Sequence, residues 1–306
     1  MTQATPNSPR HAYLITAHDK PDQLITLLGL LDDASNDLYL HIDKKAAAIH
    51  DGDLIAAVRH ASIQFVPRLD ARWGSEVFID AIVSLLKEAV KTEHVYYHLL
   101  SGVDLPLKPQ KEIHKFFEEH PGKEFVAFDQ KTADPRVLAQ RLGKYSFRRP
   151  VNPLALRVYK RIDPLWSKLQ SAFRVNRIRR CSFAFQKGAV WFSITHPFAR
   201  FVLEQMPRYR PYYRNSVCAD EIWLQTILVN SLFMEHRFFS GWDDELAATM
   251  RYVDWSDGGR SPKVLTNADF DALMASGALF ARKFDRAVDA AAIDGIAQAV
   301  RSGETD

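Results

Sequence analysis

Short, continuously apolar segments alternate with amphipathic segments through the first third of the chain. Four apolar segments have the length of buried strands, namely Ala12–Ala17, Leu38–Ile42, Ser62–Val66 and Tyr96–Leu100. Between them, apolar positions recur at helical spacing over Asp22–Leu31 and Ser75–Lys91. Helices that separate short buried strands are typical of βαβ crossovers. The pattern therefore predicts an α/β fold with a mainly parallel central sheet flanked by helices.

The remainder of the chain combines the same two patterns. Segment 136–180 is predicted to be mostly helical, with breaks at Pro150, Pro153 and Pro164. After it we expect, in order, strand Ala189–Ile194, helix Pro197–Gln205, helix Ala219–Asn230, strand Met250–Val253, helix Asn267–Ser276 and helix Arg286–Arg301. No internal repeat or long linker interrupts this order. We therefore expect a single domain over 1–306, with a helical insertion at 134–181.

The composition is that of a globular protein with a full core. The chain is 47% hydrophobic and 25% charged, which excludes a disordered, collagen-like or disulfide-scaffold protein. The net charge of +3 conceals a strong segregation. Thirteen Lys and Arg residues and a single acid, Asp163, lie between Arg136 and Arg180, so this stretch carries +12 and the rest of the chain −9.

Cysteine usage and targeting signals point to the cytoplasm. The two cysteines, Cys181 and Cys218, fit a reducing compartment, in which they serve as buried hydrophobic residues. The first ten residues are polar and lack an apolar core, so we expect no signal peptide. No window approaches the ~18 uninterrupted apolar residues that a membrane-spanning helix needs.

Several common catalytic signatures are missing. The chain has no GxxxxGKS/T phosphate loop, no GxGxxG after the first predicted strand, no GxSxG and no HExxH. His41 and Asp43 lie two residues apart on a predicted strand and therefore face the same side. A third ligand is missing from this local pattern, so we expect no metal site there.

Polar residues gather where the predicted strands end. They include His18, the segment 41–45 and the segment 101–104. Ligands of parallel α/β sheets bind at this edge, so these residues are candidates for a binding site. Asp104 is the one carboxylate in the turn that follows the predicted strand Tyr96–Leu100.

Two further segments place polar groups at helix starts. Ser75 is predicted to cap the helix that follows Arg72, Trp73 and Gly74. Asp220 and Glu221 fall in the first turn of an otherwise apolar predicted helix. Favourable placement of acids in the helix dipole explains them as well as a catalytic role does.

Eight fragments, in order and at family-like spacing, resemble one known family. They are AYLITAHDKPDQLITLL, LYLHIDKK, RWGS, YYHLLSGVDLPLK, KGAVWFSITHPFARFVL, ADEIWLQTIL, MRYVDW and ALFARKFD. Together they resemble the core-2/I-branching β-1,6-N-acetylglucosaminyltransferase family, which also includes protein O-xylosyltransferases. Each fragment alone is a weak signal, whereas the ordered set covers nearly the whole chain.

The resemblance implies a GT-A-type, Rossmann-like glycosyltransferase that uses a UDP-sugar, inverts the anomeric carbon and needs no metal or other cofactor. It implies Glu221 as the catalytic base, and Arg260 and Lys283 as the cations that hold the donor diphosphate. The matching positions for the nucleotide are Ala17, His18, Asp43, Arg72, Trp73 and Ser75. Those for the donor or acceptor sugar are Asp104, Trp191, Asp220 and Tyr252.

The same resemblance divides the expected domain by role. Residues 10–130 form a nucleotide-sugar-binding half, and 182–306 form an acceptor and catalytic half with a C-terminal helix. The chain departs from the family at Ala189, where many relatives have serine, and it lacks the cysteine framework and membrane anchor of the animal secretory enzymes. Segment 136–180 does not align convincingly, so the resemblance does not identify the acceptor.

We expect a bacterial-type enzyme of surface polysaccharide or glycoconjugate synthesis, with UDP-GlcNAc as donor and a glycan or lipid-linked glycan as acceptor. UDP-xylose is the alternative donor. A sugar-binding homologue without catalysis is the alternative from another class, although Glu221, Arg260 and Lys283 are all present.

The basic segment 136–180 has more than one interpretation. A solvated helical face explains its charge, and so does a surface for anionic lipid or a polyprenyl-diphosphate-linked acceptor. Aromatic and aliphatic residues interleave with the cations, as in helices that lie on membrane surfaces. No recognised nucleic-acid-binding module accompanies the charge, so we do not expect a nucleic-acid partner. We expect the enzyme in the cytoplasm, and the second interpretation adds a peripheral contact to the inner membrane face through 136–180.

Overall fold

A computed structural model describes residues 10–71, 74–131, 134–146, 153–259 and 261–303. Its central sheet has six strands in the order β3-β2-β1-β4-β7-β6. They are β1 (His11–Ala17), β2 (Asn36–Ile42), β3 (Ser62–Phe65), β4 (Tyr96–Ser101), β6 (Phe125–Val126) and β7 (Phe192–Thr195). Strands β3, β2, β1 and β4 are parallel, and β7 runs antiparallel to both of its neighbours. The expected α/β class with a mainly parallel sheet is confirmed.

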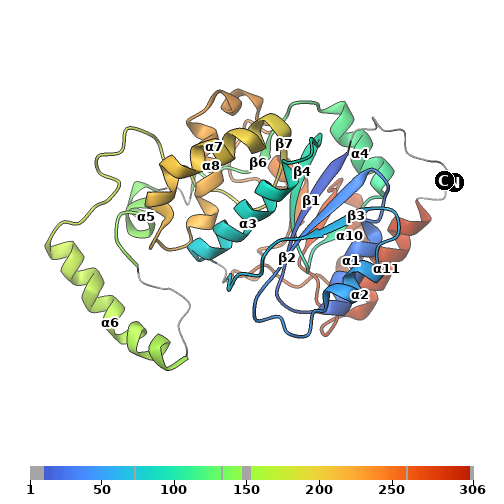
Figure 1. Cartoon of the computed structure of the whole chain (residues 1–306), viewed down its shortest axis with the longest axis horizontal. Helices are drawn as coiled ribbons and strands as arrows, with labels where there is room; N and C mark the ends of the chain where they lie inside the picture. Colours follow the sequence, from blue (N-terminus) through green and yellow to red (C-terminus); the bar gives the residue numbers. More distant parts are fainter. Residues whose placement is uncertain (1–9, 72–73, 132–133, 147–152, 260, 304–306) are drawn as a thin grey trace.

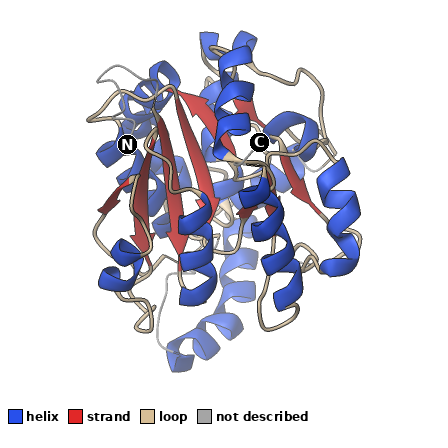
Figure 2. Cartoon of the chain, turned by 90° about the vertical axis from the view of Figure 1, so that its right-hand side faces the viewer, coloured by secondary structure: helices blue, strands red, loops and turns tan. Residues whose placement is uncertain are grey.

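Helices cover both faces of this sheet (Figures 1 and 2). One face packs against α3, α7 and α8, and the other against α1, α4 and α11. The helices are α1 (Pro21–Leu30), α2 (Asp51–Ala56), α3 (Glu76–Ala89), α4 (Gln110–Glu119), α5 (Pro135–Arg141), α6 (Pro153–Ala172), α7 (His196–Tyr213), α8 (Trp223–Val229), α9 (Glu245–Thr249), α10 (Phe270–Ala275) and α11 (Ala290–Ser302).

The position of β1 in the middle of the sheet explains its uninterrupted apolar sequence. Successive side chains of a strand point to opposite faces. Ala12 and Leu14 therefore pack into one hydrophobic cluster, whereas Tyr13 and Ile15 pack into the other. Both faces of β1 are covered, so no polar side is needed.

A small second sheet brings residues 280–284 close to the end of β4. It consists of β5 (Leu105–Pro106), β9 (Phe280–Arg282) and β8 (Arg251–Val253), with β9 in the middle. Strand β9 is antiparallel to β5 and parallel to β8. Just beyond β9, the N–H of Phe284 donates to the carbonyl oxygen of Val103 at 2.9 Å. Residues 280–284 thereby lie beside the turn that follows β4.

The expected break at Pro164 is wrong, since α6 runs through it, and α7 likewise continues past Pro207 and Pro211. A proline inside a helix removes one backbone hydrogen bond, and a helix of eighteen or twenty residues keeps the others. Pro153 is the first residue of α6, where a missing N–H costs little. Pro150 lies outside the described residues.

The predicted helix Ala219–Asn230 is interrupted. Ala219–Glu221 form a 3₁₀ turn, and α8 begins only at Trp223. The backbone of Ile222, with φ −128°, separates the two. Asp220 and Glu221 therefore precede α8 instead of lying in its first turn, which overturns the helix-dipole explanation in the form in which we predicted it.

Two helix starts differ from the prediction. Thr266, not Asn267, caps the turn before α10, and it forms a capping box with Asp269. Asp289 caps α11, whose predicted start was Arg286. In both cases an oxygen-bearing side chain within three residues of the predicted start provides the cap.

Two chemical expectations concern the whole chain. Cys181 and Cys218 are both free thiols, although each is only partly buried. Among the described residues, no helix is long enough and apolar enough to cross a membrane.

Candidate functional site

A cleft opens at the carboxyl ends of β1, β2 and β4, and we call it the strand-end cleft. Strand β2 lies on one side of β1, and β4 lies on the other. Such a switch point is where open α/β sheets bind ligands. The cleft has a volume of about 360 Å³ and is lined by Thr16, Ala17, His18, Asp19, His41, Asp43, Lys45, Ala71, Phe78, Ser101, Gly102, Val103 and Arg282.

Three of the residues predicted to bind a nucleotide meet in this cleft. Ala17, His18 and Asp43 all line it. Ser75 is the N-cap residue of α3, as predicted, although its side chain makes no capping hydrogen bond. Arg72 and Trp73 lie outside the described residues.

The His41 and Asp43 side chains hold the neighbouring loop. Asp43 accepts hydrogen bonds from the backbone N–H groups of Lys45 and Ala71, both at 2.8 Å. Nε2 of His41 accepts from the N–H of Leu69 at 3.0 Å, which requires a neutral ring. Burial is the main cause that lowers the pKa of His41 and favours this state. Both side chains therefore shape the wall of the cleft.

This arrangement also bears on metal binding. The Nε2 atom of His41 that accepts a backbone hydrogen bond is not available as a metal ligand. Within the described residues, no group of three His, Cys, Asp or Glu side chains is placed to hold an ion.

A buried ion pair closes one end of the strand-end cleft. Asp104 accepts hydrogen bonds from the N–H and the hydroxyl of Ser101, at 2.8 and 2.7 Å. Nε of Arg282 lies 3.3 Å from the same carboxylate. The Arg282 guanidinium also lies 3.8 Å from the centre of the Trp191 ring. Trp191 is only 3% exposed, so this cation covers the ring face predicted to meet a sugar.

Arg282 was missed by sequence reasoning. It stands beside Lys283 in the ARKF segment, which we singled out for its lysine. Burial is the main cause that lowers the pKa of Arg282, and the charges of Asp104 and Glu245 oppose that change. The guanidinium stays charged in any case. Its guanidinium lines the cleft, and the Asp104 carboxylate balances its charge.

Of the two cations predicted to hold a diphosphate, Lys283 directly follows β9. Nζ of Lys283 donates to the hydroxyl of Ser261 at 2.5 Å. Ser261 directly follows Arg260, which itself lies outside the described residues. Tyr252, on β8, is half-buried and pairs in register with Ala281 of β9. Lys283 and Tyr252 therefore belong to the same corner of the molecule as Arg282.

Glu221 lies in a group of charges that we call the Glu221 cluster. Its Oε2 atom is 2.5 Å from Nη1 of Arg141 and 3.5 Å from Nζ of Lys187. Lys187 also pairs with Asp129 at 2.5 Å. The N–H of Gly188 donates to the Glu221 backbone carbonyl at 2.9 Å. The carboxylate is thus positioned by two cations, while its side chain keeps 26% of its surface exposed.

Asp220 has a different environment from its neighbour. It is fully buried, and its Oδ2 atom accepts from the N–H of Gly74 at 3.2 Å. Burial, followed by the charge of Glu221, raises the pKa of Asp220 to about 7. The side chain joins the Gly74 turn to the Glu221 turn, whereas we predicted a contact with sugar.

Charges from both the Glu221 cluster and the cleft act on the pKa of Glu245, at the start of α9. Burial raises the pKa of this carboxyl group to about 7, and the charge of Asp129 adds to the rise. Arg282 opposes it. Since Arg282 lines the cleft and Asp129 holds Lys187, Glu245 lies within electrostatic reach of both. No sequence motif marks it.

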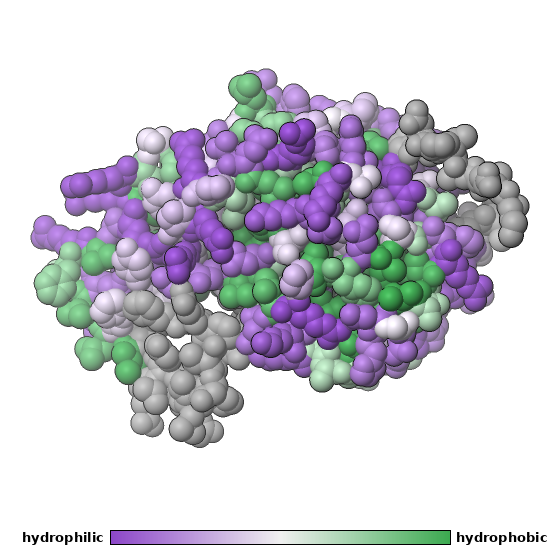
Figure 3. Space-filling view, in the orientation of Figure 1, coloured by the Kyte–Doolittle hydropathy of each residue, from purple (hydrophilic) through white to green (hydrophobic). Residues whose placement is uncertain are grey.

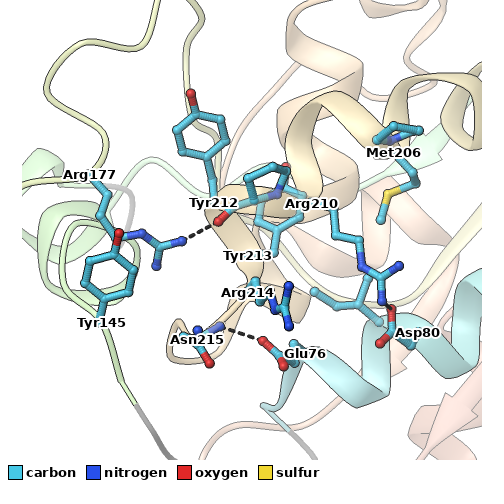
Figure 4. A pocket seen from close by; sticks show the side chains of 13 residues that line it. Glu76, Asp80, Tyr145, Arg177, Met206, Arg210, Tyr212, Tyr213, Arg214 and Asn215 are labelled. Carbon is cyan, nitrogen blue, oxygen red and sulfur yellow. Dashed lines mark hydrogen bonds and ion pairs between the residues drawn. The ribbon is translucent and has the colours of Figure 1, made fainter.

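A second pocket, of about 840 Å³, lies beside α3 and α7 (Figure 4). On one side Arg177 stacks 4.4 Å from the centre of the Tyr145 ring, and on the other Arg210 pairs with Asp80 at 2.8 Å. The described residues that line it include none of those predicted to form a site. Size alone is a poor guide here, and we assign the site to the strand-end cleft and the Glu221 cluster.

The fold and the site define a class: an α/β protein with a cleft at a sheet switch point and a carboxylate held between cations. Comparison with known families identifies it further. Residues 11–273 match the family described as Core-2/I-Branching enzyme. The chain belongs to this family and is a glycosyltransferase.

Among solved structures, the apo form of mouse xyloside xylosyltransferase 1 is similar to the chain. The two sequences are 12% identical, the match covers 89% of this chain and 97% of the mouse chain, and the TM-score is 0.37. The search of curated proteins gives no match. The mainly parallel sheet fits the GT-A-type fold that the family resemblance implies.

Proposed function

We propose that this glycosyltransferase moves a sugar, GlcNAc in our preferred assignment, from a UDP-sugar to a glycan hydroxyl with inversion and without a metal. The observation that carries the proposal is the Asp104–Arg282 pair. It occupies the turn after β4, where metal-dependent relatives of this fold hold a cation between carboxylates. Here the lone carboxylate is bound by Ser101 and by a guanidinium of the protein itself.

The proposed reaction is a single displacement. The acceptor oxygen attacks the anomeric carbon while the bond from that carbon to the UDP β-phosphate oxygen breaks. Glu221 takes the proton of the acceptor hydroxyl, and the electron pair of the broken bond leaves with UDP. A positioned base of this kind contributes about 10²–10⁴ in rate. Arg141 and Lys187 restrict the carboxylate to one orientation, which supports the positioning that such a step needs.

Charge that develops on the leaving diphosphate requires cations in the cleft. We propose Arg260 and Lys283 as its direct partners, with Arg282 adding a fixed field from the buried side. A guanidinium binds phosphate oxygens in pairs, whereas an ammonium acts as a point charge. Loss of one such preorganised contact costs about 3 kcal/mol in the barrier.

The first test is the Glu221→Gln variant, assayed for transfer from UDP-GlcNAc and for UDP binding. We expect transfer to fall by about 10²-fold or more, because glutamine cannot accept the proton, while UDP binding is unchanged. The exposed Glu235→Gln serves as the matched control and should behave as wild type. Wild-type turnover in Glu221→Gln would remove this residue from the mechanism.

The second test concerns metal. We expect full activity after dialysis against EDTA, because the two cations Arg260 and Lys283 supply the positive charge. Activity assayed in EDTA and after addition of Mn²⁺ should agree. A strict dependence on Mn²⁺ contradicts the two-cation account.

The donor sugar and the existence of catalysis are tested together. A thermal-shift series with UDP, UDP-GlcNAc and UDP-xylose should show the largest stabilisation with the true donor. A preference for UDP-xylose would select the xylosyltransferase alternative. Binding without hydrolysis or transfer of any donor would favour a sugar-binding homologue.

A further inference from the structure

Helix α6 stands apart from the rest of the molecule (Figure 1). Four large apolar side chains in the second half of α6 and directly after its last residue are exposed: Ile162 (51%), Leu165 (69%), Leu169 (47%) and Phe173 (75%). Their spacing of three, four and four residues places them on one face of the helix. Figure 3 shows apolar residues gathered at this outer edge, over α6.

Other side chains of the same helix hold α6 in place. Nε1 of Trp166 donates to the Tyr145 carbonyl oxygen at 3.1 Å, and the Gln170 amide donates to the same oxygen at 3.0 Å. Lys144 binds the hydroxyl of Ser171 at 2.6 Å. Because these contacts fix the rotation of the helix about its axis, the apolar row faces away from the body.

The surroundings of the row are strongly basic. Lys168 and Arg174 are exposed on the same segment, and Arg179 and Arg180 are exposed shortly after it. The whole stretch 136–180 contains thirteen cations and a single acid. An apolar face flanked by cations is complementary to a surface that is apolar inside and negatively charged outside.

We propose that α6 lies on an anionic lipid membrane, with Ile162, Leu165, Leu169 and Phe173 in the headgroup and acyl boundary and the neighbouring cations against lipid phosphates. The helix would then bind parallel to the membrane plane, since the described part of the row is one helix face and not a spanning segment. This interaction does not depend on the proposed transfer reaction, because it is a property of the surface.

The experiment is vesicle flotation of the full-length protein. Wild type should float with vesicles of phosphatidylcholine and phosphatidylglycerol, and much less with phosphatidylcholine alone. Leu165→Asp/Leu169→Asp should lose binding by about tenfold or more, because each substitution places a charge in the apolar boundary. Lys168→Glu/Arg174→Glu should weaken binding and reduce its sensitivity to salt.

Leu232→Asp is the matched control. Leu232 is 87% exposed on a 3₁₀ turn outside the basic segment, so its replacement should leave flotation unchanged. All variants alter exposed side chains, and circular dichroism should show wild-type folding. Equal flotation of wild type and Leu165→Asp/Leu169→Asp would overturn the proposal. A second result would also overturn it: wild type is a dimer by light scattering, Leu165→Asp/Leu169→Asp is a monomer, and neither protein floats with vesicles.

Discussion

Gly188 occupies a position where a larger residue cannot fit without a backbone shift. A Cβ atom built there would lie 1.8 Å from the carbonyl oxygen of Ala127. The N–H of the same residue donates to the Glu221 carbonyl. The close approach of two backbones thereby fixes the turn that carries Lys187 next to the proposed base.

We predict that Gly188→Ala lowers both stability and activity. The turn must move away from Ala127, and overpacking of this kind costs about 1–3 kcal/mol. Urea unfolding measures the loss of stability, and kcat measures the displacement of Lys187 and Glu221. Gly52→Ala is the control, because nothing lies within 4 Å of its Cβ and alanine is favoured in helix α2 by up to ~1 kcal/mol. Equal stability and equal kcat in Gly188→Ala and Gly52→Ala would contradict a tight backbone contact at Gly188.

At the scale of residues, the sequence indicated which side chains belong to the site better than it indicated their contacts. Ala17, His18 and Asp43 line one cleft because parallel strands end at one edge. Arg141 and Arg282 could not be assigned partners from sequence, because each pairs with an acid that is far along the chain. Burial likewise depends on the fold, so Trp191 and Asp220 were predicted as more accessible than they are.

Glu124, the residue before β6, joins two elements of the second half of the chain. Its carboxylate accepts from the N–H of Thr195 at 3.0 Å and from the Thr195 hydroxyl at 2.5 Å. Thr195 ends β7 and caps α7. Burial raises the pKa of Glu124 to about 7, although both hydrogen bonds act against the rise.

We predict that ionisation of the Glu124 carboxyl group lowers the free energy of unfolding as pH rises. The unfolded chain releases the proton near the ordinary pKa, 4.5, whereas the folded chain keeps it until about 7. The folded state binds more protons between these values, so the free energy of unfolding falls across this window, by about 3 kcal/mol at most.

Glu124→Gln removes this titration. Its free energy of unfolding, measured in urea between about pH 4 and pH 8, should depend less on pH than that of wild type. Some dependence should remain because burial also raises the pKa of Asp220 and Glu245 to about 7. The exposed Glu118→Gln should follow wild type. If the free energy of unfolding of Glu124→Gln depends on pH as strongly as that of wild type, Glu124 does not titrate as described.

At the scale of elements, buried strands were predicted most closely. The predicted strand Tyr96–Leu100 differs from β4 by one residue, because its apolar run is bounded by polar residues. Helix ends were harder to predict. Prolines at 164, 207 and 211 are strong local signals for a break, yet α6 and α7 run through them. In α7, tertiary packing overrides the signal, because Met206, Tyr209 and Tyr213 are buried in the core.

The two predicted halves of the molecule are interleaved. Strand β7, from the second half, pairs with β4 of the first half, with Tyr96 opposite Thr195. Strand β9 pairs with β5. Ile293 and Ile296 of α11 share a hydrophobic cluster with Leu24 and Leu27 of α1. Neither half therefore has a hydrophobic core of its own.

This interleaving predicts a single cooperative unfolding transition. Loss of either half would expose apolar surface that the other half covers, at ~25 cal/mol per Å², so neither half should persist alone. Urea midpoints from far-ultraviolet circular dichroism and tryptophan fluorescence should coincide. Ile296→Ala, which leaves a cavity at a fully buried position, should move both midpoints together and cost about 2–5 kcal/mol. Separate midpoints in wild type, or a shift of only one in the variant, would show that residues 10–130 and 182–306 unfold as separate domains.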